Sequence, residues 1–150
     1  EMYEETLPHF DTADVAILSA AVADYRPKNA ADQKIKKTSA SLDIELEPTP
    51  DILKSLGEAK KNQILVGFAL ETQHGLANAQ GKLERKNCDL IVMNTLQDEN
   101  AGFGFDTNKV TFVSRNNSIE TELKSKHEIA LDLLNYIREH FLWEHLYFLL

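Results

Sequence analysis

The fold is decided by residues 64–93, which read ILVGFALETQHGLANAQGKLERKNCDLIVM. Ile64–Phe68 and Leu90–Met93 are short apolar runs, typical of strands that are buried on both faces of a sheet. Between these runs, apolar residues recur at helical spacing, which predicts a helix that starts at residue 71 or 72 and runs to about 86. Strand, helix and strand in this order predict a parallel βαβ unit.

Weaker patterns predict further elements on both sides of this unit. Val15–Ala20 is another apolar run and indicates a buried strand, whereas Ser39–Glu47 alternates apolar and charged residues as a half-exposed strand does. The other predicted elements are a helix over Glu1–Phe10, a helix capped by Thr49 with Pro50 and Asp51 in its first turn, a hairpin of Lys109–Val113 and Ile119–Leu123, and a closing helix over Lys124–His140.

Together these elements predict an α/β fold with a mostly parallel sheet and an antiparallel hairpin at its margin. Sheets of this kind bind ligands outside the carboxyl ends of their strands. Here those ends are followed by Ala20–Asp24, Phe68–Thr72 and Asn94. The topology therefore predicts a ligand site at this edge.

The composition is that of a globular protein of one domain. The chain has 150 residues, 43% of them hydrophobic and 27% charged, with a formal net charge of −8. An acidic balance argues against binding to nucleic acid or to an anionic membrane surface. Cys88 is the single cysteine, so an internal disulfide is excluded and a reducing, cytoplasmic location is expected.

Three clusters could carry chemistry, and each has a plainer alternative. Ala20–Pro27 offers small residues, an acidic Asp24 and a basic Arg26, or it is an ordinary surface turn. Lys34-Ile35-Lys36-Lys37 could hold phosphates, or it is a solvated loop. Lys82 and Lys86 share a helix face, where like charges repel unless an anion binds, or they belong to a solvated face.

The glycines at 102 and 104, the histidines and the cysteine are not predicted to form a site. Gly102-Phe103-Gly104 lacks the third glycine of a dinucleotide fingerprint, since Thr107 occupies that position, and it is interpreted as a turn. The five histidines show no metal-ligand spacing, and no metal site is predicted. Cys88 is expected to be a small buried hydrophobe.

The ordered motifs resemble one family. They are AAVADYRP at 20–27, KIKK at 34–37, PTPDIL at 48–53, VGFALET at 66–72, KLERKNCDLIVMN at 82–94 and GFGFDTN at 102–108. Their order and spacing resemble bacterial phosphopantothenoylcysteine synthetase, the ligase domain of a bifunctional coenzyme A biosynthesis protein that also carries a flavin-dependent decarboxylase. The resemblance covers about residues 1–137. It implies a Rossmann-like three-layer fold, a homodimer with its contact near 42–47, and fusion to the decarboxylase.

The implied reaction is a CTP-dependent ligation that uses Mg²⁺. The carboxylate of 4′-phosphopantothenate attacks the α-phosphate of CTP and forms an acyl-cytidylate, which the amine of cysteine then converts to an amide. The resemblance assigns Lys34 as catalytic and as nucleotide-binding. It further assigns the nucleotide to Asp24, Thr49, Pro50, Asp51, Ile52, Phe68, Lys82 and Lys86, and the intermediate to Ala20 and Ala21.

The sequence also departs from the family pattern. The family's first strand–helix unit has no counterpart here, so residues 1–140 are expected to form the C-terminal portion of the synthetase domain. Residues 141–150, FLWEHLYFLL, are expected to be an apolar helical tail, too short to span a membrane. Two alternatives therefore stay open: a catalytically silent nucleotide-binding or dimerisation module, and a flavin- or nicotinamide-binding fragment.

Overall fold

The computed structural model describes residues 1–31, 33–35, 41–95, 98, 101–102 and 104–142. Lys36 and Lys37 and the tail residues 143–150 lie outside the described residues. The elements are α1 (Met2–Phe10), β1 (Val15–Leu18), β2 (Tyr25–Pro27), β3 (Leu46–Pro48), α2 (Ile52–Ala59), β4 (Ile64–Glu71), α3 (Gly75–Arg85), β5 (Leu90–Thr95), β6 (Thr107–Asn108), β7 (Val110–Val113), β8 (Ser118–Glu120), β9 (Lys124–Ser125), α4 (Lys126–Ile137) and a π-helical turn, η1 (Arg138–Leu142).

The main sheet has the strand order β1-β4-β5-β7-β8. β1, β4 and β5 are parallel, with Val15 opposite Ile64 and Val66 opposite Leu90. β7 is antiparallel to β5, and β8 is antiparallel to β7. The predicted α/β class, the parallel βαβ unit and the marginal antiparallel hairpin are therefore confirmed.

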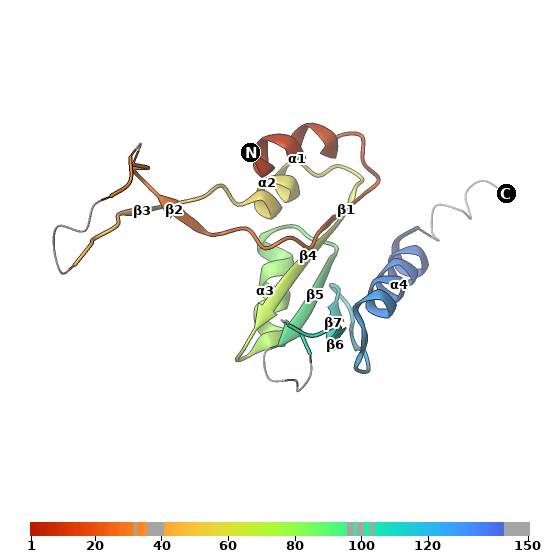
Figure 1. Cartoon of the computed structure of the whole chain (residues 1–150). Coiled ribbons are helices and arrows are strands. Elements are labelled where there is room, and N and C mark those ends of the chain that lie inside the picture. The colour runs from red at the N-terminus through yellow and green to blue at the C-terminus, as the bar shows by residue number, and fades with distance from the viewer. Residues whose placement is uncertain (32, 36–40, 96–97, 99–100, 103, 143–150) are drawn as a thin grey trace.

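Helices cover both faces of this sheet and make three layers (Figure 1). Along β4, Leu65 and Ala69 face the cluster formed with α1, α2 and α3, whereas Ile64 and Val66 face the cluster formed with α4. This alternation with both faces apolar explains why the strand sequence is continuously hydrophobic. Cys88 is buried in the first cluster, as expected, and burial raises the pKa of its thiol to about 12.

Some predicted boundaries are wrong. β4 continues to Glu71, where it pairs with Thr95 of β5, so α3 begins at Gly75 and not at residue 71 or 72. α4 begins after Ser125, which accepts a hydrogen bond from Glu128 N in a capping box, so the closing helix starts two residues later than predicted. Regular α-helix then ends at Ile137, and η1 follows.

The predicted strand over Ser39–Glu47 is largely absent from its described part, residues 41–47. Only Leu46–Pro48 forms a strand, β3, which pairs antiparallel with β2. Salt bridges Arg26–Glu47 and Lys28–Glu45, both at 2.7 Å, join the two sides of this two-stranded ribbon. Figure 1 shows the ribbon extending away from the main sheet.

Candidate functional site

A cleft of about 790 Å³ opens at the carboxyl edge of the parallel strands. Its lining includes the residues that follow β1, the end of β4 and the end of β5, as the topology predicts. The cleft brings together ten predicted site residues from separate segments of the chain: Ala20, Ala21, Asp24, Thr49, Pro50, Asp51, Ile52, Phe68, Lys82 and Lys86.

One wall of the cleft consists of two segments that are tied together at the root of the ribbon. Thr49 N donates to Asp24 O at 2.9 Å, and Thr49 Oγ1 donates to Ala23 O at 2.5 Å. Thr49 is therefore a cross-link to the Ala20–Asp24 segment and not the helix cap that the sequence predicted. Ala20 and Ala21, which have small side chains, line the same cleft.

The cap of α2 is Asp51, whose Oδ1 accepts a hydrogen bond from Lys54 N at 3.0 Å. The N-terminus of α2 contributes Ile52 and Leu53 to the cleft lining. The first N–H groups of a helix lack partners within it and carry partial positive charge. This helix end therefore favours an anionic group in the cleft.

Asp51 also holds Lys86, with Nζ lying 2.9 Å from Oδ2 and 3.2 Å from Oδ1. Burial raises the pKa of Asp51. The hydrogen bonds from Lys54 N and Lys86, together with the charges of these two lysines, lower it by more, so the net pKa lies below the ordinary 3.8. Asp51 is thus ionised at neutral pH and fixes Lys86 beside the start of α2.

Lys82 is paired separately, with Nζ lying 3.6 Å from Glu71 Oε1 at the end of β4. The prediction that Lys82 and Lys86 repel each other until an anion binds is therefore incomplete, because each lysine has its own carboxylate. Both lysines remain part of the cleft lining. The arrangement places Lys86 beside the start of α2 and Lys82 beside the end of β4, each next to a carboxylate.

Lys34 lies in the far part of the ribbon, and the cleft lining does not include it. The catalytic role assigned to Lys34 stays a prediction, as do the binding roles of the ten cleft residues. The neighbouring residue Ile35 is 58% exposed. Leu42 and Ile44 are exposed to a similar degree, at 62% and 59%. The ribbon therefore presents apolar surface to solvent.

Sequence reasoning missed part of the cleft. Met2 and Thr6 on α1 line it, although α1 carries no polar motif that would have indicated this. Gly102 also lines the cleft, in the stretch interpreted as a turn. Its φ of +85° is a left-handed conformation that glycine adopts without strain, which supports the turn interpretation.

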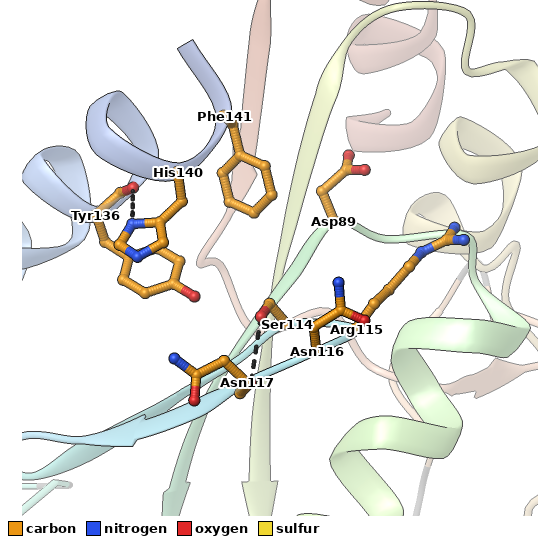
Figure 2. A pocket seen from close by; sticks show the side chains of 8 residues that line it. All are labelled: Asp89, Ser114, Arg115, Asn116, Asn117, Tyr136, His140 and Phe141. Atoms are coloured by element: carbon orange, nitrogen blue, oxygen red, sulfur yellow. Dashed lines mark hydrogen bonds between the residues drawn. The ribbon is translucent and has the colours of Figure 1, made fainter. Parts of the chain in front are cut away.

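A second cavity, of about 290 Å³, lies at the opposite edge of the sheet, near the start of β5 and the β7–β8 turn (Figure 2). His140 stacks on Tyr136 with ring centroids 3.9 Å apart, and its Nδ1 lies 3.0 Å from Tyr136 O. Asp89 is held by Lys60 Nζ, at 2.9 Å to both oxygens, and by Leu65 N at 2.8 Å. These polar groups serve the packing of α4 and α2, and no predicted site residue lies here.

Two features are absent from the described residues. No group of three or more His, Cys, Asp or Glu side chains is arranged to hold a metal ion. None of the helices in the described ranges has the length and apolar character needed to cross a bilayer.

Residues 1–141 match the protein family described as the DNA/pantothenate metabolism flavoprotein C-terminal domain. A curated relative named Cysteine/Cysteine sulfinic acid decarboxylase, from an unknown prokaryotic organism, is 50% identical over 139 residues, 91% of this chain. The Coenzyme A biosynthesis bifunctional protein CoaBC of Bacillus subtilis (strain 168) is 46% identical over 138 residues, also 91% of the chain. The chain spans 39% and 34% of the length of these relatives.

Among solved structures, the crystal structure of the C-terminal domain of a Coenzyme A biosynthesis bifunctional protein CoaBC is similar, with a TM-score of 0.73 and 40% sequence identity. The similarity covers 92% of this chain and 60% of that one.

Proposed function

Because the chain belongs to the family of DNA/pantothenate metabolism flavoprotein C-terminal domains, we propose that it supplies the nucleotide-binding part of a CTP-dependent phosphopantothenate–cysteine ligase. One observation carries this proposal: ten residues assigned to the nucleotide or the intermediate, from segments between positions 20 and 86, line a single cleft. The name of the relative from Bacillus subtilis, a coenzyme A biosynthesis protein, supports the same metabolic context.

The charges of the cleft suit a triphosphate. Lys82, Lys86 and the N-terminus of α2 could each contact a phosphate oxygen. Glu71 and Asp51, which pair with the two lysines, would then share them with the phosphates or face Mg²⁺. Attack on a phosphate by a carboxylate brings two anions together, so the site must neutralise charge and hold the groups in line. Mg²⁺ would enter bound to the phosphates of CTP and would neutralise part of their charge, since this ion keeps most of its contacts to substrate phosphates and water.

The proposed reaction has two steps. In the first, a carboxylate oxygen of 4′-phosphopantothenate bonds to the α-phosphorus of CTP, and the α–β phosphate bond breaks to release pyrophosphate. In the second, the amine nitrogen of cysteine bonds to the acyl carbon, loses a proton, and CMP leaves with the bridging oxygen. Ala20 and Ala21 would lie beside the acyl-cytidylate, where small side chains allow close approach of the backbone.

Lys34 would act from the ribbon. Its position outside the cleft lining means that a catalytic contact requires Lys34 and the bound nucleotide to approach each other. A long lysine side chain on such a segment could then neutralise charge that develops on the phosphates. This role predicts that loss of Lys34 lowers turnover more than it lowers nucleotide affinity.

The ribbon would also form a homodimer contact. A two-stranded ribbon is marginally stable by itself. Leu42, Ile44 and Leu46 on this ribbon are each more than half exposed, and apolar surface of this kind marks an interaction site. Sedimentation analysis tests the contact: the wild type should be dimeric, and Ile44→Lys combined with Leu46→Lys should give a monomer. An unchanged dimer would show that the contact lies elsewhere.

Calorimetric titration of the chain with CTP and Mg²⁺ tests the binding proposal. Lys82→Met and Lys86→Met should each weaken binding by about 10- to 100-fold, the effect of losing one charged hydrogen bond. Lys61→Met is the matched control, because Lys61 is exposed and pairs with Asp11 away from the cleft. Equal losses in all three variants would contradict a cleft-specific site.

A second measurement separates ligase activity from the alternatives. With 4′-phosphopantothenate, cysteine and CTP present, the ligase releases pyrophosphate and CMP. Binding of CTP without either product would identify a silent nucleotide-binding module. Yellow colour or flavin fluorescence in the purified chain, with no affinity for CTP, would instead identify the flavin-binding alternative.

A further inference from the structure

Glu71 occupies the last position of β4, at the edge of the sheet where the cleft opens. Its side chain is only 14% exposed, although it carries a charge. A carboxylate this buried needs partners that compensate for lost hydration. One oxygen, Oε1, faces Lys82 Nζ at 3.6 Å, and the other, Oε2, accepts a hydrogen bond from Asn78 Nδ2 at 3.0 Å.

Asn78 fixes this carboxylate in place. Its Nδ2 donates a second hydrogen bond, to Gln73 O at 3.0 Å, in the loop that joins β4 to α3. Both amide hydrogens of Asn78 are therefore engaged. Asn78 and Lys82 are four residues apart on α3, so they lie on one face of the helix and reach the same Glu71 side chain.

The second lysine of the cleft is held differently. Lys86 pairs with Asp51, whose side chain is 43% exposed and already caps α2. Capping α2 is therefore a structural role of Asp51 that does not depend on Lys86. Neither a helix cap nor a strand pairing accounts for the Glu71 side chain, which contacts Lys82 and Asn78.

We propose that Glu71 and Asn78 are positioning residues for Lys82, and this inference rests on the proposed nucleotide-binding function. Lysine is a flexible point charge with considerable rotamer entropy, and binding a phosphate requires that freedom to be lost. Glu71 restricts Lys82 before the nucleotide arrives, and Asn78 restricts Glu71. Protein kinases use the same chemistry, because a glutamate pairs with the lysine that contacts the phosphates of ATP.

The test is a set of calorimetric titrations with CTP and Mg²⁺. Glu71→Gln keeps the size of the side chain and removes its charge, and Asn78→Ala releases the carboxylate. Each should raise the Kd by about 2- to 12-fold, the effect of leaving one long side chain to be ordered on binding. In a Lys82→Met background, Glu71→Gln should change the Kd by less than about 2-fold, since the group that it positions is gone.

Asp132→Asn is the matched control, because it removes the carboxylate that pairs with Lys124 at 2.7 Å on the far face of the sheet. It should leave the Kd unchanged. Tighter or unchanged binding in Glu71→Gln, with weaker binding in Lys82→Met, would overturn the positioning role and leave the proposed function standing. An equal loss in the Lys82→Met background would show that Glu71 acts on the fold in general, and would also overturn the role.

Lysine-selective ¹³C NMR provides a readout without nucleotide. The Cε signal of Lys82 should shift and narrow in both Glu71→Gln and Asn78→Ala, while the signal of Lys124 stays in place. Unchanged Lys82 signals would overturn the inference whether or not CTP binds. If the signals change but the wild type does not bind CTP, the nucleotide-binding proposal fails and the positioning role fails with it.

Discussion

Replacing Gly57 with alanine tests how closely α2 packs on the end of α3. α3 ends in a Schellman turn, in which Cys88 N donates to Leu83 O and Asn87 N donates to Glu84 O. A Cβ at position 57 would lie 1.9 Å from Lys86 O and 2.8 Å from the Lys86 carbonyl carbon. These are backbone atoms of that turn, so they cannot rotate away, and α2 must move.

The expected loss of stability follows from three contributions. Overpacking costs about 1–3 kcal/mol. Movement of α2 also weakens the hydrogen bond from Asn87 Nδ2 to Gly57 O, 2.9 Å long, which contributes about 1 kcal/mol. Alanine offsets about 1 kcal/mol through its better helix propensity. The net loss is about 1–3 kcal/mol, which lowers the Tm of a domain of this size by about 2–12 °C.

Gly81→Ala is the matched control, because Gly81 is also helical. Its added Cβ would meet Arg85 Nη1 at 2.7 Å, the far end of a flexible side chain that can move aside. Alanine should therefore gain about 0.5–1 kcal/mol and raise the Tm by about 1–4 °C. Thermal unfolding followed by circular dichroism compares the two variants. A Tm that rises equally in both would refute the packing argument.

Three further predictions concern charged and reactive side chains. Asp89→Ala should lower the free energy of unfolding in urea by about 1.5–3 kcal/mol, because it leaves the largely buried Lys60 ammonium and Leu65 N without their acceptor. Asp51→Asn should be less stable than the wild type above about pH 4, and the difference should disappear as the pH falls through the lowered pKa of Asp51, because protonation removes the same charge. The thiol of Cys88 should resist Ellman's reagent at pH 8 and react once guanidinium unfolds the chain, since burial raises its pKa to about 12.

The strands of the main sheet could be predicted because the pattern of apolar residues in each strand reflects which of its faces are buried. β4 and β5 are apolar on both faces, and helices do cover both faces. The end of β4 could not be predicted in this way, because Glu71 is polar and stays in the strand through its pairing with Thr95. The alternation over 39–47 indicated a half-buried strand, but a periodic pattern does not specify what covers its apolar side.

The position of the cleft was predictable from topology, whereas its internal contacts were not. Parallel strands bring their carboxyl ends to one edge, so Ala20, Phe68 and Asn94 all line the cleft. The pairing of Lys82 with Glu71 spans eleven positions and depends on where β4 ends and how α3 leaves it. Spacing along the helix, the signal available in the sequence, showed only that Lys82 and Lys86 share a face.

The root of the ribbon has a consequence for how the protein tolerates change. Residues 25–48 leave and rejoin the body at one point, where Thr49 bonds to Ala23 and Asp24. Insertions or deletions further out would therefore not alter the register of β1 against β4. A tilt of the ribbon, by contrast, would be transmitted through Thr49 and Pro50 to Asp51, the first contact of α2 with the cleft. The outer ribbon can thus diverge in length, whereas Thr49 couples the direction of its base to the position of Asp51 at the start of α2.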